Sequence, residues 1–137
     1  MRSPIALASL IALTAAQEPP RAQVEGNWRN PSGSAIIAIA PCGKTLCGKV
    51  VWASPRARRE ASKSTPNVVG TTVLTGLRRS GNRWTGTLFI PDDNVRVSAR
   101  LQPIGPSQLK LSGCVLAGLF CRTQVWTRAD GPLPSGG

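Results

Sequence analysis

The stretch of residues 95–102 reads VRVSARLQ, and in it each apolar residue is followed by a polar one. Successive side chains of a β-strand point to opposite faces, so this period of two places the apolar side chains on one face and the polar ones on the other. A strand with one buried and one hydrated face is typical of an antiparallel sheet. The stretch therefore predicts antiparallel β-structure for the chain around it.

Similar short runs lie on both sides of this stretch, and Gly, Pro, Asn and Ser interrupt them about every ten residues. In the preceding run, Trp84, Leu88 and Ile90 share the face that we expect to be buried. Residues 80–81 and 91–94 have the composition of tight turns, so consecutive strands are expected to pair as hairpins. The expected strands are 26–29, 35–40, 46–52, 71–79, 82–90, 95–102, 108–113 and 122–128.

An unpaired edge strand can form hydrogen bonds with another chain, so these strands need an arrangement without exposed edges. Closure into a barrel removes both edges, so we predict an all-β fold, a small antiparallel up-and-down β-barrel of about eight strands. A two-sheet sandwich is the alternative. The longest connection, residues 53–70, is expected to hold a short helix over 56–62, with Ser54 and Pro55 at its start and Pro66 after its end.

The N-terminal residues 1–16 have the pattern of a secretory signal peptide. Arg2 precedes an apolar run over residues 5–13, and small residues follow, which suggests cleavage after Ala16. The run is shorter than the ~20 residues of a membrane span, so we expect no transmembrane segment in the mature protein. A buried N-terminal helix is the alternative. The expected product is exported to the periplasm, with a flexible leader at 17–24, one domain at 25–130 and a disordered tail at 131–137.

The composition argues against catalysis. The 137 residues carry a net charge of +11, with six carboxylates and no His, the usual proton-transfer group near neutral pH. Asp92 and Asp93 are the only adjacent carboxylates, but neighbouring turn residues usually point apart and bind the local backbone. We therefore predict a protein that is not an enzyme, with no cofactor and no metal site.

The four cysteines allow three disulfide pairings, and pairing is expected in an oxidising compartment. In an up-and-down barrel, the turn flanked by Cys42 and Cys47 lies at the opposite end from the turn flanked by Cys114 and Cys121. Bonded cysteines need Cα atoms within about 7 Å, so the local pairing of each turn is predicted. A redox dithiol is the alternative, although neither spacing is C-x-x-C.

Several motifs together resemble an exported bacterial family called domain of unknown function 2147. They are GNW at 26–28, CGKTLCGKVV at 42–51, GTTVLTGL at 70–77, WTG at 84–86, and GC at 113–114 with CRTQVWTR at 121–128. The resemblance implies a small lipocalin-like β-barrel in the cell envelope, with no established reaction. The sequence departs from the family pattern at residues 91–94, at Val97 and in the basic segment after the third strand, so ligand contacts of relatives are not carried over there.

The Gly-x-Trp motif implies a structural role. In lipocalin-like barrels such a Trp closes the narrow end beneath an Arg from the last strand. Arg128 is the candidate partner of Trp28, and a stacked cation and ring contribute roughly 0.5–2 kcal/mol. We predict that this pair is a structural plug and not a binding site.

The opposite, wider end is where we expect a ligand. Residues 30–34, 53–70, 91–94 and 115–120 would ring it, with 53–70 able to fold over it as a basic lid. We predict that the protein binds a small apolar or anionic molecule there; alternatively, the apolar residues of 115–120 only cover their own disulfide and the barrel end. The candidate ligand-binding residues are Arg56, Arg58, Arg59, Lys63, Leu116, Leu119 and Phe120.

The strong positive charge supports a second hypothesis. A basic exterior could contact an anionic envelope component, such as a polymer or lipid headgroups, or an acidic protein. Export argues against a nucleic-acid partner, and so does the lack of an aromatic stacking row, because the four Trp residues fall on separate strands.

Overall fold

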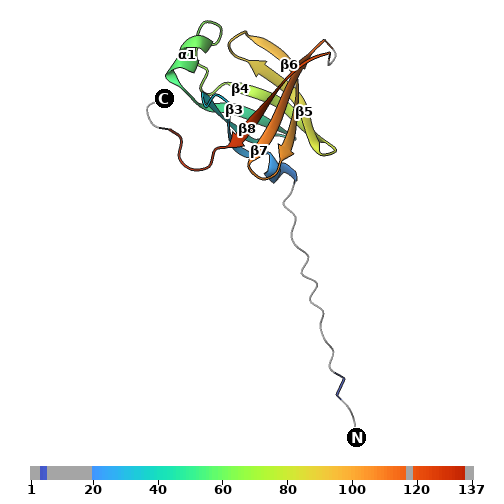
Figure 1. The fold of residues 1–137 in the computed structure, drawn as a ribbon. Coiled ribbons are helices and arrows are strands. Elements are labelled where there is room, and N and C mark those ends of the chain that lie inside the picture. Colours follow the sequence, from blue (N-terminus) through green and yellow to red (C-terminus); the bar gives the residue numbers. More distant parts are fainter. Residues whose placement is uncertain (1–3, 6–19, 117–118, 135–137) are drawn as a thin grey trace.

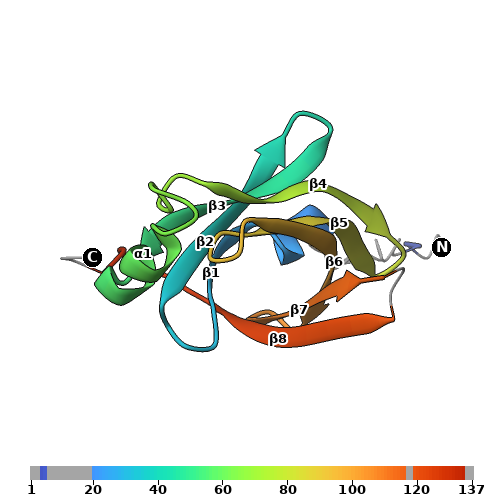
Figure 2. The ribbon, with the colours of Figure 1, turned by 90° about the horizontal axis from the view of Figure 1, so that it is seen from above.

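The computed structural model describes residues 4–5, 20–116 and 119–134, and its strands close into one barrel. Each strand pairs antiparallel with the next, and β1 pairs with β8, which confirms the up-and-down barrel and shows that the sandwich alternative is wrong. Figure 2 shows the strands in this order around the ring, seen from above. Their bounds are β1 Gly26–Arg29, β2 Ala35–Cys42, β3 Thr45–Ala53, β4 Thr72–Ser80, β5 Arg83–Ile90, β6 Val95–Ile104, β7 Gln108–Val115 and β8 Phe120–Arg128.

Several strands run further than their sequence patterns predict. The β2–β3 ladder continues to the pair Cys42 and Thr45, and the β7–β8 ladder continues to the pair Val115 and Phe120. The residues at these hairpin ends were expected in loops, but their backbone groups pair across the hairpin. The connections at both disulfide turns are therefore short.

The helix α1, Pro55–Ala61, forms in the predicted segment. The Ser54 hydroxyl accepts a hydrogen bond from the Ala57 backbone N–H at 3.1 Å, and Pro55 occupies the first turn, where its missing N–H costs nothing. Figure 1 shows α1 at one end of the barrel and the N-terminal turn η1, Pro20–Gln23, at the other. We call the α1 end the wide end and the η1 end the narrow end.

The expected flexible leader, residues 17–24, differs from the structure in its second half. Residues 20–23 form the 3-10 turn η1, and the side chain of Val24 is fully buried. The carbonyl of Val24 accepts a 2.8 Å hydrogen bond from Nε1 of Trp28, because a buried indole N–H needs a partner. The packed domain therefore begins before residue 25.

The other predicted terminal segments are described only in part. The predicted signal peptide, residues 1–16, lies outside the described residues except for Pro4 and Ile5, and residues 17–19 of the leader lie outside as well. In the predicted tail, residues 131–134 form neither helix nor strand, and residues 135–137 lie outside the description.

Burial along β6 changes from one end of the barrel to the other. The side chains of Leu101 and Ala99 are fully buried in the core, Val97 is half-buried, and Val95 is 43% exposed. The sequence placed all four on the inward face, and they do line the core or the interior space above it. The interior is therefore packed at the narrow end and open at the wide end.

Candidate ligand-binding site

The narrow end is closed by Trp28 and Arg128. The Trp28 side chain is fully buried, and the Cζ atom of Arg128 lies 4.2 Å from the centre of its ring. The Arg128 guanidinium also donates hydrogen bonds to the carbonyls of Glu25 at 2.9 Å, Pro106 at 2.9 Å and Gln23 at 3.2 Å. The contact expected for a structural plug is present; its contribution to stability remains a prediction.

Gly26 allows this contact. Its φ angle is +120°, which a residue with a side chain rarely adopts, and a Cβ atom there would lie 2.7 Å from Nη1 of Arg128. Both residues of the Gly-x-Trp motif therefore belong to the plug, because the glycine leaves space for the guanidinium that covers the tryptophan ring.

Above the packed core, the wide half of the barrel holds a cavity of about 1500 Å³, which we call the wide-end cavity. This exceeds the roughly 300–1000 Å³ of typical small-molecule sites, and it includes the mouth. All four segments predicted to ring the wide end contribute to its lining. Most apolar side chains of its wall come from the strands, and these are Ala35, Ile37, Val50, Ala53, Val73, Leu88, Phe89, Ile90, Val95, Val97, Leu111, Val115, Phe120 and Trp126.

Only some of the seven predicted ligand-binding residues line the wide-end cavity. Arg56, Leu119 and Phe120 line the wide-end cavity. Arg58 and Arg59 do not line it, because α1 turns the face with Arg56 and Glu60, spaced four residues apart, toward the cavity. Arg58 and Arg59 line a separate pocket, and neither Lys63 nor Leu116 is among the residues that line either space.

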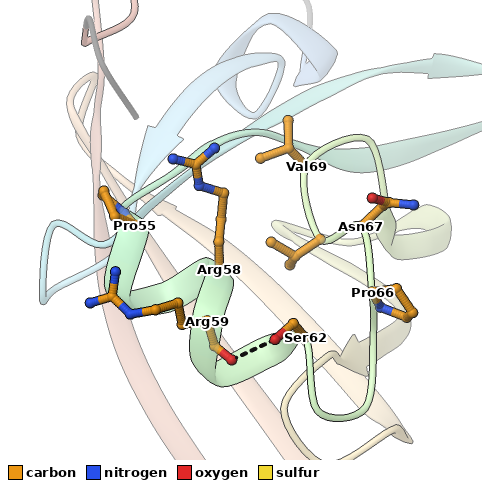
Figure 3. A pocket seen from close by; sticks show the side chains of 8 residues that line it. Pro55, Arg58, Arg59, Ser62, Pro66, Asn67 and Val69 are labelled. Carbon is orange, nitrogen blue, oxygen red and sulfur yellow. Dashed lines mark hydrogen bonds between the residues drawn. The ribbon is translucent and has the colours of Figure 1, made fainter.

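The separate pocket is smaller and lies between α1 and the segment that follows it. It has a volume of about 520 Å³ and is formed by Pro55, Arg58, Arg59, Ser62 and residues 66–69. Figure 3 shows Arg58 reaching between Pro55 and Val69, and the Ser62 hydroxyl donating to the Arg59 carbonyl. Its two arginines give it a basic lining, but the strands of the barrel contribute no wall to it.

The apolar loop at the mouth is tighter than the sequence predicts. Val115 and Phe120 face each other as the last pair of the β7–β8 ladder, and the Leu119 N–H donates to the Leu116 carbonyl at 3.2 Å. Residues 117–118 lie outside the description. Leu119 and Phe120 line the cavity yet are 79% and 64% exposed, so the mouth has an apolar rim.

The two disulfides join the cysteines of each turn, which confirms the local pairing. Cys42 is bonded to Cys47, with Cα atoms 5.5 Å apart, at the narrow end. Cys114 is bonded to Cys121, with Cα atoms 4.1 Å apart, directly below the rim of the wide end. One disulfide therefore holds the mouth and the other lies far from it.

The long loop that carries α1 is fastened to the opposite rim. The hydroxyl of Thr65 donates a 3.0 Å hydrogen bond to the carbonyl of Pro91, in the turn between β5 and β6. Seen from above, α1 lies at the edge of the barrel opening and does not cover its centre (Figure 2). The predicted basic lid is thus a side wall of the mouth in this conformation.

Two polar residues of β8, Arg122 and Gln124, face inward and were not predicted as site residues from the sequence. Trp126 on β8 is buried in the core, so the alternation of the strand places Gln124 and Arg122 on the same inward face, and both line the cavity. The sequence contained the information to find them, because Arg122, Gln124 and Trp126 are spaced two residues apart in the β8 stretch CRTQVWTR and therefore share one face. The apolar residue Val125 obscures this pattern, because it faces outward while its polar neighbour Gln124 faces inward.

Neither metal ligands nor membrane helices are found in the described part of the chain. Residues 4–5, 20–116 and 119–134 contain no group of three or more His, Cys, Asp or Glu side chains able to hold a metal ion. Within the same residues no helix has the length and hydropathy to cross a bilayer.

Comparison with known proteins agrees with this architecture. No curated protein matches the sequence. Among solved structures, protein HP1028 from Helicobacter pylori, described as belonging to the lipocalin family, superposes with a TM-score of 0.59. The two are 10% identical, and the match covers 77% of this chain and 82% of that one, so the likeness concerns the fold. Residues 26–128, the whole barrel, match the family described as "Uncharacterized protein conserved in bacteria (DUF2147)", and the chain belongs to this family.

Proposed function

We propose that this chain is an exported, periplasmic, non-catalytic protein that binds one small molecule, at least partly apolar, in the wide-end cavity. The observation that carries this proposal is the cavity itself, which has apolar walls, the packed core beneath it and an open mouth. An eight-stranded barrel is wide enough to hold one modest ligand, and the lipocalin-like fold is compatible with this use.

The lining supports binding over catalysis. Its charged residues are Arg56, Glu60, Asp92, Asp93 and Arg122, of which Arg56 and Glu60 pair at 3.0 Å. Asp92 and Asp93 lie in the exposed turn between β5 and β6, and no His exists to exchange protons with them. Of the residues predicted from the sequence, Arg56, Leu119 and Phe120 are the ones that we propose contact the ligand.

A matched pair of tryptophan substitutions tests the proposal. Val97 is half-buried on the inward face of β6 and lines the cavity, whereas Val125 faces outward on β8. We expect Val97→Trp to place an indole ring against the apolar wall of the cavity and to weaken binding of a neutral apolar probe, decan-1-ol, at least tenfold, while Val125→Trp leaves binding unchanged. Isothermal titration calorimetry measures both, and equal affinities in the two variants would contradict a site inside the barrel.

The export proposal has its own test. N-terminal sequencing of the mature protein from the periplasmic fraction of a bacterial host is expected to begin at Gln17. Retention of the full chain in the cytoplasm would contradict it.

The exterior favours a second candidate, contact with an anionic envelope component. Arg78 and Arg100 are exposed on the outer face, and each lies opposite Thr85 on the intervening strand. Strands are about 4.8 Å apart, so two cations face outward within roughly 10 Å. Binding to anionic phospholipid vesicles that is lost between low and high salt and in Arg78→Gln/Arg100→Gln would support this surface; salt-independent or absent binding would contradict it.

A further inference from the structure

We propose that the wide-end cavity takes an amphipathic anion, with its carboxylate, sulfate or phosphate group bound by Arg122 and its apolar body against the wall of β5, β6 and β7. This inference rests on the proposed function, because it names the ligand class of the same cavity. It follows from the position, surroundings and free hydrogen-bond donors of Arg122.

Arg122 lies just inside the mouth of the cavity. Arg122 pairs with Gly113 across the β7–β8 ladder, and the rim pair Val115 and Phe120 lies two residues nearer the mouth. Two residues of strand correspond to about 7 Å, so the backbone of Arg122 lies one layer below the rim. Among the described residues that line the cavity, Arg122 is the only charged one contributed by a strand of the barrel wall.

An apolar surface lies across the β7–β8 ladder from Arg122. Gly113 has no side chain, and a Cβ atom at its position would lie 3.2 Å from a Val97 methyl group and 3.5 Å from a Leu88 methyl group. These methyl groups therefore cover the position directly across the ladder from Arg122. A ligand bound there meets a guanidinium on one side and aliphatic carbon on the other.

The hydrogen-bond donors of Arg122 are open to a ligand. The Arg122 side chain is exposed and, within the part of the chain that the structure describes, has neither an ion pair nor a hydrogen bond. The other lining cation, Arg56, pairs with Glu60 at 3.0 Å, and Asp92 and Asp93 belong to the exposed turn at the rim. A planar guanidinium that presents its donors unpaired suits a carboxylate, sulfate or phosphate.

Gln124 adds a second donor on the same face. Its Oε1 accepts a 3.0 Å hydrogen bond from Nε1 of Trp126. The indole nitrogen can only donate, so this bond fixes the amide with its oxygen toward Trp126 and leaves its NH₂ group for another acceptor. The guanidinium of Arg122 and the amide NH₂ of Gln124 therefore offer two donors to one anionic group.

The experiment compares two probes with the same chain length on the full mature protein. Decanoate carries the anionic group and decan-1-ol does not. We expect the wild type to bind decanoate at least tenfold more tightly than decan-1-ol, and Arg122→Gln to remove this preference while leaving the affinity for decan-1-ol within about twofold. Arg83→Gln is the matched control, because Arg83 lies at the narrow end on the β4–β5 hairpin, and it should leave both affinities unchanged.

A second variant keeps the bond to Trp126. Gln124→Glu retains an acceptor for the indole but removes the NH₂ donors and adds a negative charge, so decanoate binding should fall at least tenfold while decan-1-ol binding stays unchanged. Circular dichroism melting verifies that both variants fold.

The outcomes separate the two proposals. Equal wild-type affinities for both probes, or an Arg122→Gln variant that loses both equally, would overturn the assignment of Arg122 but leave a binding cavity. If neither probe bound the wild type and native mass spectrometry found no co-purified small molecule, the proposed function itself would fail. Should Arg122→Gln not fold, Gln124→Glu decides, because unchanged decanoate binding in that variant would overturn the assignment.

Discussion

The guanidinium of Arg128 lies over the Trp28 ring at 4.2 Å and donates to three backbone carbonyls of the chain segments around it. These carbonyls belong to the N-terminal segment and to the β6–β7 turn, which are distant in sequence. One side chain from the last strand thus joins the first strand, the N-terminal turn and a hairpin at the narrow end.

Removing this side chain should destabilise the barrel. We expect Arg128→Ala to lower the free energy of unfolding by about 2 kcal/mol, because the ring contact and the carbonyl hydrogen bonds are lost together. Urea denaturation followed by tryptophan fluorescence measures the change. Arg83→Ala, at an exposed site of the same end, is the control; an unchanged stability of Arg128→Ala would refute the structural plug.

Gly26 should tolerate no side chain. In Gly26→Ala the new methyl group meets Nη1 of Arg128 and the residue keeps a φ of +120°, so we expect a loss of at least about 2 kcal/mol. Gly81 has a φ of +65° with open space around it, so Gly81→Ala carries backbone strain alone and should cost about 1 kcal/mol. Thermal melting of the two variants compares them, and equal losses would show that contact with Arg128 is unimportant.

The two disulfides should differ in their effect on binding. Each closes a short loop, and either double serine variant is expected to lose about 2 kcal/mol of stability. Only Cys114→Ser/Cys121→Ser releases the apolar rim, so this variant should change the dissociation rate of decan-1-ol, whereas Cys42→Ser/Cys47→Ser should not. Stopped-flow measurement of dissociation distinguishes them, and identical rates would argue that the rim does not control access.

The bond between Thr65 and Pro91 should slow ligand release. Thr65→Val removes the only side-chain hydrogen bond that the described residues show between the α1 loop and the β5–β6 turn. We expect the decan-1-ol dissociation rate to rise severalfold while stability changes by less than about 1.5 kcal/mol. Thr45→Val removes a comparable hydroxyl-to-carbonyl bond at the narrow end and is the control. A Thr65→Val rate equal to that of Thr45→Val would contradict a role for the loop.

Much of the barrel could be predicted because strand alternation is local. The pattern of residues 95–102 assigns each side chain to a face, and the structure places these side chains on those faces. The pairing of Cys42 with Cys47 followed from the same logic, because an up-and-down barrel separates the two hairpins. The helix start at Ser54 and Pro55 was equally local, since capping involves neighbouring residues.

The candidate site was harder to predict. Arg56 and Arg58 belong to the same basic run, yet one lines the cavity and the other lines a different pocket, because the helix turns them to different sides. Arg122 was not singled out, since its surroundings come from β5, β6 and β7. The structure differs from the predicted flexible leader at Val24 for a related reason. The Val24 side chain is buried only when Trp28 and the end of the barrel are in place.

The sequence by itself determined which segments form strands, which side chains share a face and which cysteines pair, because these depend on a period of two and on adjacent hairpins. The tertiary structure alone decided how deep each inward side chain lies. Leu101 and Val95 share one face of one strand, but closure of the barrel buries the first completely and leaves the second 43% exposed at the mouth. Depth along the barrel axis depends on strands distant in sequence, and that depth separates the packed core from the cavity that holds Arg122.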